Sequence, residues 1–445
     1  MYVKILLTKI WVILYSFTER NIEYIHNSIQ RDRHISMKKI LVIGYVWPEP
    51  NSSAAGSHMM SILRLFKKQN WHVEFATPSQ PTEHMIDLEK EGISSKNITL
   101  NCDSFDIYIN SYQPNMVMFD RFMMEEQFGW RVEKNCPNAL KILDTEDLQC
   151  LRNARYQSHK AEREFTQADL FSDLAKREIA AILRCDISLI ISSYEMEILE
   201  KTFKVDPNLL HHLPFMVDLA KLPKETLHFS QRKHFMTIGN FRHAPNWDVV
   251  LYLQQIWPLI KKQIPDAELH IYGSYPPPKA TALNNPKTGF LIKGWAEDAF
   301  TVMERSRLCL APIRFGAGIK GKLLDAMIMQ TPSITTSLGS EGMHKDEPWP
   351  GVVTDDMDEF VNAAVTLYND EDTWAKAQIN GTKLLKTRYD SHLLGQGLIG
   401  KITETEETLQ EHRLNNFMGS MLKHHTMMST KYMSQWIAEK NKTTL

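Results

Sequence analysis

The sequence predicts an α/β protein of two domains, each built on a parallel sheet that helices cover on both faces. Short apolar runs, typical of buried strands, alternate with amphipathic helical patterns, and this alternation occurs in two successive sets. The chain has 445 residues, enough for two or three domains. We expect a first domain at residues 37–218, a linker at 219–233, a second domain at 234–400 and C-terminal helices at 401–445.

The first set begins with the apolar run 40–46, which suits a buried parallel strand. A loop rich in Pro, Asn, Ser and Gly follows at 48–57, and an amphipathic helix at 58–69 completes a strand–helix unit. The same patterns predict a helix at 171–183 and further strands at 73–77, 115–120, 140–144 and 187–192.

The second set repeats the alternation. It predicts strands at 234–239, 268–273 and 308–313, and helices at 247–264, 322–329 and 373–387. Asn246 is the expected N-cap of the second-domain helix that follows it, and residues 401–442 are interpreted as helices.

Composition excludes several classes of protein. The chain has 51 Lys and Arg against 53 Asp and Glu, so no overall field favours nucleic acid, and an anion site has to be local. Five widely spaced cysteines without a C-x-x-C pair indicate neither a disulfide framework nor a zinc site, and a reducing, cytoplasmic compartment is expected. Residues 1–36 carry an apolar stretch broken by Lys9 and no small-residue cleavage site, so we expect an N-terminal extension outside the fold.

The segment 308–342 carries the most chemistry. An apolar strand pattern is followed by a glycine-rich turn, with Gly316, Gly318 and Gly321, and then by a short helix. Two lysines, Lys320 and Lys322, lie at the start of this helix. Backbone amides at a helix N-terminus bind anions, and lysines add charge, so the pattern predicts a phosphate site. Asp325 is three residues after Lys322, so both share a helix face, and a carboxylate there can accept hydrogen bonds from sugar hydroxyls. A nucleotide sugar carries both groups.

Two other interpretations of this segment stay open. The spacing Gly316-x-Gly318-x-x-Gly321, with Glu341 about 20 residues on, matches the dinucleotide fingerprint. That fingerprint belongs in the first strand–helix turn of a domain, whereas this one follows several elements, so we favour the nucleotide sugar. In the simplest alternative, the glycines only turn the chain and the lysines are solvated.

A family resemblance extends this hypothesis. The run HFMTIGNFRHAPNWDVVLYLQQIWPLIKKQIPDAELHIYGSYPP, followed by FLIKGWAEDAFTVMERSRLCLAPIRFGAGIKGKLLDAMIMQTPSITTSLGSEG, resembles the donor-binding half of family 4 glycosyltransferases (glycosyl transferases group 1) of the GT-B fold. The resemblance implies two Rossmann-like domains facing across a cleft, with last helices that cross back onto the first domain. It also implies that Lys322 contacts the donor diphosphate, that Asp325 binds the ribose and that these two carry the catalytic function. The remaining expected donor-binding residues are Gly316, Gly318, Lys320, Arg242, Gly56 and Glu341.

The sequence departs from the family pattern at three points. The family's pair of glutamates falls on Ala317 and Asp325, so the first carboxylate is absent and the second is shorter. The family's arginine and lysine after the first strand of this domain fall near Asn240 and Pro245, and Arg242 is the nearby cation that could substitute. The family's Ala-x-Gly-x-Pro motif after the donor helix reads Ile328-Met329-Gln330-Thr331-Pro332 here, with bulkier side chains in place of the alanine and the glycine.

Polar residues of the first domain are candidates for the acceptor side of the cleft. Asp144, Glu146 and Asp147 follow a predicted strand, where open α/β sheets bind their ligands. They could instead hold a divalent ion or simply decorate a helix start. His58 is a further candidate for the cleft, with a purely structural role as the alternative.

Taken with the resemblance, these patterns predict a retaining, metal-independent glycosyltransferase without a cofactor. Its partners would be a nucleotide-sugar donor and an acceptor that the sequence does not identify, and an association with the inner face of a membrane stays open. No catalytic triad signature, H-E-x-x-H or Walker motif occurs, so hydrolase, zinc and kinase hypotheses lack support. A nucleotide-sugar epimerase and a non-catalytic nucleotide-sugar-binding protein remain as alternatives.

Overall fold

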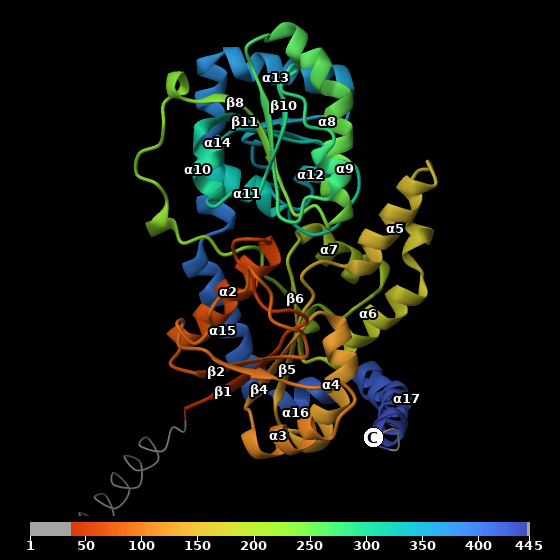
Figure 1. Cartoon of the computed structure of the whole chain (residues 1–445). Helices are drawn as coiled ribbons and strands as arrows, with labels where there is room; N and C mark the ends of the chain where they lie inside the picture. The colour runs from red at the N-terminus through yellow and green to blue at the C-terminus, as the bar shows by residue number, and fades with distance from the viewer. Residues whose placement is uncertain (1–36, 443–445) are drawn as a thin grey trace, which may run out of the picture.

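The computed structural model describes residues 37–442, and the expected extension at residues 1–36 lies outside this range. Within it, the chain forms two parallel sheets with helices on both sides of each (Figure 1). The strand orders are β3-β2-β1-β4-β5-β6-β7 and β10-β9-β8-β11-β12-β13. Because all strands of a parallel sheet share one direction, the loops after their carboxyl ends gather at one edge of each sheet.

The first sheet is formed by seven short strands: β1 (Lys39–Ile43), β2 (His72–Thr77), β3 (Ser94–Asn97), β4 (Met116–Asp120), β5 (Leu140–Asp144), β6 (Ile187–Ile190) and β7 (Leu210–His212). The central strands are buried almost throughout, which explains their continuous apolar sequences. The connecting helices are α2 (Ala54–Lys68), α3 (Ser104–Tyr112), α4 (Phe122–Asn135), α5 (Gln149–Lys160), α6 (Asp173–Arg184) and α7 (Ser193–Glu197).

The second sheet consists of β8 (Lys233–Ile238), β9 (Leu269–Tyr272), β10 (Phe290–Gly294), β11 (Ser306–Ala311), β12 (Ser333–Thr335) and β13 (Gly351–Val353). Its helices are α8 (Ala244–Gln263), α9 (Pro278–Thr281), α10 (Ala299–Arg305), α11 (Gly321–Ile328), α12 (Ser337–Ser340), α13 (Met357–Asn369) and α14 (Glu371–Arg388). The central strand β11 is buried along its whole length and leads into the glycine-rich turn before α11.

The chain passes between the domains twice, and the two passages lie side by side. The Val217 amide donates to the Tyr389 carbonyl oxygen at 2.7 Å, and the Ser391 amide donates to the Val217 carbonyl oxygen at 2.9 Å. After the second passage, α15 (Ser391–Glu407) packs against α2, and α17 (Phe417–Lys442) runs along α4 and α6. Between them, α16 (Leu409–Asn415) binds Asp186 and Pro137, which follow α6 and α4, through Arg413. The C-terminal helices therefore belong structurally to the first domain.

Two local predictions need correction. Helix α8 begins at Ala244 with His243 as N-cap, so Asn246 is not the cap but lies in the first turn, where Pro245 suits the helix start. Helix α2 begins at Ala54, because the Ser53 hydroxyl caps the Gly56 amide, and Gly56 therefore lies in the helix and not in the preceding loop.

The C-terminal stretch 401–442, predicted as helices, is divided at Thr408 and Asn416 into α15, α16 and α17. Asn416 donates to the Leu183 carbonyl oxygen at 2.7 Å and accepts from the Gly419 amide, so a tertiary contact starts a new helix at this point.

Among the described helices, none is long and apolar enough to span a membrane.

Candidate functional site

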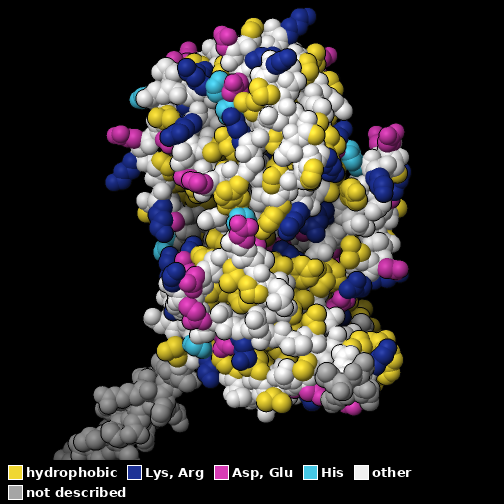
Figure 2. All heavy atoms as spheres, in the orientation of Figure 1, with side chains coloured by type: hydrophobic (Ala, Val, Ile, Leu, Met, Phe, Trp, Pro, Cys, Tyr) yellow, Lys and Arg dark blue, Asp and Glu magenta, His cyan; other side chains and the backbone are white. Residues whose placement is uncertain are grey.

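The glycine-rich turn between β11 and α11 reaches across to the first domain. The Gly318 amide donates to Glu195 Oε1 at 2.8 Å, and Arg155 Nη1 donates to the Gly316 carbonyl oxygen at 3.0 Å. Gly318 has φ of +64°, and a Cβ at this position would lie 2.9 Å from the Asp147 Cβ. Only glycine combines that backbone conformation with so close an approach, so the turn forms part of the boundary between the domains. Figure 2 shows Lys and Arg side chains at the hollow between the two domains on the face drawn.

The N-termini of two helices meet at this boundary. A Cβ at Gly321, the first residue of α11, would lie 2.4 Å from the Ala54 Cβ, and Ala54 is the first residue of α2. The positive ends of both helix dipoles therefore point to one place. Ser53 caps α2, whereas within the described residues no side chain caps α11. The Leu323 amide donates to the Lys320 carbonyl oxygen, so the Gly321 and Lys322 amides are the ones available to an anion.

The two lysines of the turn have different partners. Lys322 Nζ donates to Asn246 Oδ1 at 2.8 Å, which holds the ammonium against the first turn of α8. Lys320 Nζ donates to the Gly318 carbonyl oxygen at 2.6 Å and so braces its own turn. Burial lowers the pKa of each lysine to about 8. A bound anion would favour the charged form of Lys322 and raise its pKa again.

Asp325 lies one turn further along α11, on the same face as Lys322. Burial raises the pKa of its carboxyl group to about 7. Ligand hydroxyl groups that donate to this carboxylate would compensate for its lost hydration. The arrangement thus combines an anion-binding helix start with an acceptor group one turn away.

The other expected donor-binding residues occupy varied positions. The Arg242 side chain is exposed after β8, with its guanidinium 3.7 Å from the centre of the Tyr275 ring. Glu341 makes two hydrogen bonds of 2.7 Å to Arg155, so its carboxylate links the two domains. A Cβ at Gly56 would lie 2.5 Å from the Glu49 backbone, which gives this glycine a packing role at the start of α2.

The acidic residues of the first domain form a buried cluster at the carboxyl ends of β4 and β5. Asp120 and Asp144 are paired in register on these strands, and Glu146 follows with φ of +61°. Burial and the charge of Asp120 raise the pKa of Asp144 to about 7, and burial with the charge of Asp144 raises the pKa of Glu146. The Arg121 guanidinium lies 3.6 Å from Asp120 and offsets part of this negative charge.

His58 of α2 lies beside this cluster. Its Nε2 is 3.9 Å from Asp144 Oδ1, and its ring packs edge-on against Phe215 at 5.4 Å between ring centres. Burial lowers the pKa of His58 to about 4, so the ring is neutral at physiological pH. Neither ring nitrogen has a hydrogen-bond partner within the part of the chain described here. The structure therefore brings His58 next to Asp144, whereas Asp147 is paired with Arg152 at 2.6 Å.

Three residues of this region were missed by the sequence reasoning: Asp120, Arg121 and Glu195. Asp120 ends the predicted strand 115–120, so its position at the strand end was the available signal. Glu195 accepts from the Leu148 and Gly318 amides at 3.0 and 2.8 Å, and burial raises its pKa to about 8. Nothing in its local sequence distinguishes Glu195, because its partners lie 47 and 123 residues away.

Potential metal ligands gather elsewhere. Across the described residues, the group that could hold a metal ion consists of His234, Glu268 and His270, whose ligand atoms lie within 4.8 Å of one another. These residues are at the amino-end side of β8 and β9, at the opposite end of the strands from the cleft. The acidic cluster of the first domain does not meet the same criterion within residues 37–442.

Comparisons with known proteins give one family match, within the second domain. Residues 232–370 match the family model described as Glycosyl transferases group 1. No curated protein sequence matches the chain.

Solved structures resemble the chain over both domains. HepE of Anabaena in complex with UDP superposes with a TM-score of 0.63 at 10% identity, covering 82% of this chain and 100% of that chain. A glycosyltransferase from Rickettsia africae superposes with a TM-score of 0.61 at 11% identity, covering 83% of this chain and 98% of that chain. A variant of S. aureus TarM in complex with Fondaparinux, alpha-GlcNAc-glycerol and UDP superposes with a TM-score of 0.52 at 14% identity. This match covers 66% of this chain and 57% of that chain.

The two parallel-sheet domains facing across a cleft define a protein of the GT-B fold, which confirms the predicted fold class. Residues 232–370 match the group 1 glycosyltransferase family model, and the superposed structures share the fold of both domains.

Proposed function

We propose that the protein transfers a sugar from a nucleoside-diphosphate sugar to an acceptor with retention of anomeric configuration, and that a metal ion is not required. The observation that carries this proposal is the meeting of the α2 and α11 N-termini beside Lys322. Both helix ends and the lysine bring positive charge to one position at the cleft.

In this mechanism, the open amides of α11 and the Lys322 ammonium bind the donor diphosphate. Asp325 accepts hydrogen bonds from the ribose hydroxyls, and Arg242 adds charge from its place on the Tyr275 ring. Lys320 acts indirectly, since it braces the Gly318 turn. The relatives HepE and TarM, whose structures contain UDP, support a uridine diphosphate sugar as the first donor to test.

The chemical step depends on stabilising the departing diphosphate. Negative charge grows on its oxygen atoms as the glycosidic bond breaks, and the preorganised amides and Lys322 stabilise that charge without reorganisation. The leaving phosphate accepts the proton of the acceptor hydroxyl, so no strong protein base is needed. Glu146 is partly exposed on the opposite wall, where it orients the acceptor. The buried Asp144 accepts from the Glu146 amide at 3.2 Å and, with His58 beside it, holds this residue in position.

A metal-independent mechanism is a consequence of these cationic groups and can be tested directly. Transfer should persist in the presence of EDTA, because lysine and helix amides carry the diphosphate charge. Complete loss with EDTA, restored by Mg²⁺ or Mn²⁺, would instead assign Asp144, Glu146 and Asp147 as ligands of an ion and would overturn this part of the proposal. A His270→Ala variant run in parallel controls for metal bound at the distant His234 group.

The donor is best identified by thermal unfolding with UDP-, GDP- and ADP-sugars. A ligand that binds the folded state raises the midpoint temperature of unfolding. At a concentration of 100 times its Kd, it adds about 2.7 kcal/mol to the free energy of unfolding. Incubating the stabilising donor with and without acceptors then separates three functions. Transfer requires the acceptor, an epimerase would convert the donor sugar alone, and a binding protein would give the shift without turnover.

Cysteine chemistry agrees with a cytoplasmic location, which we include in the proposal. All five cysteines are free thiols in the structure, and four of them are buried. Reduced thiols of this kind are typical of a reducing compartment.

A further inference from the structure

The C-terminal helices carry an unusual concentration of exposed apolar side chains. Twenty large hydrophobic residues are exposed in the described chain, and eight of them lie between residues 414 and 436. They are Leu414, Phe417, Met418, Met421, Met428, Tyr432, Met433 and Trp436. Figure 2 shows apolar and basic side chains next to one another in this region, at the lower right of the view. Concentrated exposure of this kind marks an interaction surface.

Most of these side chains share one face of α17. Phe417, Met421, Met428, Tyr432 and Trp436 follow one another at steps of four or seven residues, which keeps them on one side of a helix. Trp436 is 60% exposed and Tyr432 is 57% exposed, so the face is uncovered over its C-terminal half as well. We call this set of residues the outer face of α17.

The opposite side of α17 is tied to the first domain. The Gly419 backbone packs against the Leu183 carbonyl, Lys423 lies 3.7 Å from Glu133, and the buried Ser434 hydroxyl accepts from Arg131. These contacts determine the rotation of the helix about its axis. The outer face therefore points to solvent.

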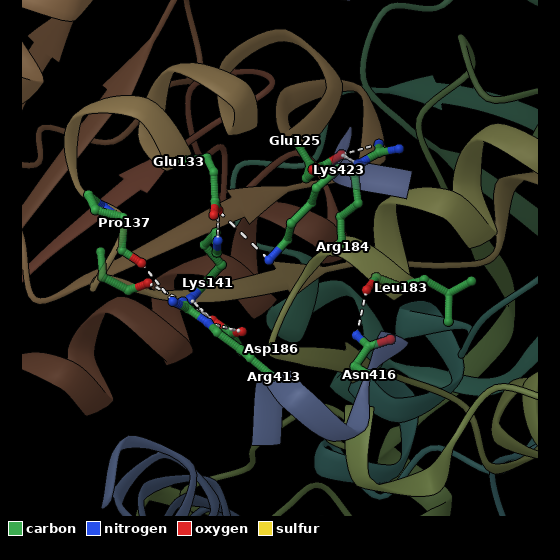
Figure 3. A network of polar contacts seen from close by, with 11 residues as sticks. Glu125, Glu133, Pro137, Lys141, Leu183, Arg184, Asp186, Arg413, Asn416 and Lys423 are labelled. Atoms are coloured by element: carbon green, nitrogen blue, oxygen red, sulfur yellow. Dashed lines mark hydrogen bonds and ion pairs between the residues drawn. The ribbon is translucent and has the colours of Figure 1, made fainter. Parts of the chain in front are cut away.

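Helix α16 and the residue that follows it strengthen this attachment (Figure 3). Arg413 binds both carboxylate oxygens of Asp186 at 2.8 Å and donates to the carbonyl oxygens of Pro137 and Ala139. Asn416 then donates to the Leu183 carbonyl oxygen at 2.7 Å. A polar network thus anchors one side of the helix, while the apolar side lacks a partner within the described chain.

Charge indicates which partner fits the outer face. Residues 417–442 contain four lysines and a single acidic residue, although the whole chain has a net charge of −2. Lys431 and Lys440 lie 5.7 and 5.4 Å from the ring centres of Tyr432 and Trp436, so cationic groups border the apolar face. An apolar face with Trp and Tyr, flanked by lysines, is typical of helices that lie in the interface of an anionic bilayer. Two copies of the same face would bring lysines together, which disfavours self-association.

We propose that α17 binds the surface of an anionic lipid bilayer, with its outer face in the headgroup region and its 26 residues parallel to the membrane. The anchored helix would hold the first domain, and with it the acceptor wall of the cleft, at the membrane. Binding requires neither donor nor turnover, so this inference and the proposed function can fail separately.

Vesicle flotation with the full chain tests the proposal. The wild type should float with vesicles of phosphatidylglycerol and phosphatidylcholine, and less with phosphatidylcholine alone. The double variant Tyr432→Ser, Trp436→Ser should lose about tenfold or more in vesicle affinity, because two interfacial aromatic side chains are removed. Lys431→Gln with Lys440→Gln should weaken binding to anionic vesicles and reduce its salt dependence.

The matched control is Ile107→Ser with Ile379→Ser, which removes apolar side chains that are 74% and 69% exposed elsewhere. This control should bind vesicles like the wild type, and circular dichroism should show that all variants are folded. Equal binding of wild type and the aromatic variant, or no binding by the wild type, would overturn the proposal. A wild-type dimer in sedimentation that the aromatic variant abolishes, without vesicle binding, would assign the face to a second copy and also overturn it.

Discussion

The two walls of the cleft are built in different ways. On the second-domain wall, Gly316, Gly318, Lys322 and Asp325 lie within ten residues of sequence, and one strand–turn–helix unit positions all of them. On the first-domain wall, the cluster is assembled from α2, β4 and β5, with His58 and Asp144 separated by 86 residues. Local spacing therefore determines the first arrangement, and the strand order of the sheet determines the second.

The two walls also differ in charge. The second-domain wall offers a helix N-terminus and Lys322 to a ligand, whereas Asp120, Asp144 and Glu146 make the first-domain wall acidic. Such a contrast suits a donor diphosphate on one side and acceptor hydroxyl groups on the other. The following predictions test this division of roles, beginning with the largest expected effect.

Lys322→Ala should reduce kcat/KM for the donor by about 10²–10³-fold, equivalent to about 3–4 kcal/mol, as for loss of one group that stabilises transition-state charge. Most of the loss should be in kcat, because the interaction strengthens as the diphosphate leaves. Steady-state kinetics over a range of donor concentrations measure both constants. Lys287→Ala, on an exposed loop of the same domain, is the control and should be neutral. Wild-type kinetics for the Lys322 variant would remove this residue from the mechanism.

Gly318→Ala should destabilise the protein by about 1–3 kcal/mol, since alanine is strained at φ of +64° and its Cβ meets Asp147. Because the strain lies where the turn contacts the first domain, donor affinity should fall as well. Gly400→Ala is the matched control: a Cβ there has no neighbour within 4 Å, and alanine favours the helix. Chemical denaturation of both variants measures the difference. Equal stabilities of the two variants would contradict the close approach at Gly318.

The same contrast between local and distant contacts determines which parts of the molecule can be predicted from the sequence. Period and composition predict β5 with its observed ends and place six other strands within two residues, whereas they miss β3, β7, β10, β12 and β13. The glycine and lysine spacing predicts the strand, turn and helix at 306–328, because these interactions are local. The roles assigned to Lys322 and Asp325 stay predictions.

Contacts between distant segments were not predictable. The bond from Gly318 to Glu195 spans 123 residues, and the ion pair of Glu341 with Arg155 spans 186. No single-sequence pattern encodes which loops meet when two domains pack. The break at Asn416 has the same origin, since its partner Leu183 is 233 residues away.

Asp325→Asn should raise the KM for the donor by about tenfold, or about 1.4 kcal/mol, with a smaller change in kcat. Ribose contacts are made in the ground state and in the transition state alike, so their loss weakens binding uniformly. Comparison of Asp325→Asn with Lys322→Ala separates binding from chemistry on the same helix. A variant with lowered kcat and unchanged KM would assign Asp325 to the chemical step.

Asp144→Asn should change how the free energy of unfolding depends on pH, by about 1 kcal/mol. This is less than the 1.4 kcal/mol per pKa unit of an isolated group, because Asp144 shares its charge with neighbouring acids. An unfolded aspartate titrates near pH 4, whereas burial and Asp120 raise the pKa of Asp144 to about 7 in the folded protein. Between these values the unfolded state loses its proton first, so wild-type stability should fall as pH rises from about 4 to 7 and then level off. The asparagine variant lacks this proton, and its stability relative to the wild type should therefore increase across the same range. Urea unfolding at pH 5 and pH 8 measures the difference, with the exposed Asp266→Asn as control. The free energies of unfolding of Asp144→Asn and the wild type could instead differ by the same amount at both pH values. That result would show that Asp144 is ionised throughout. The first-domain wall would then be a fully charged surface suited to binding a cation.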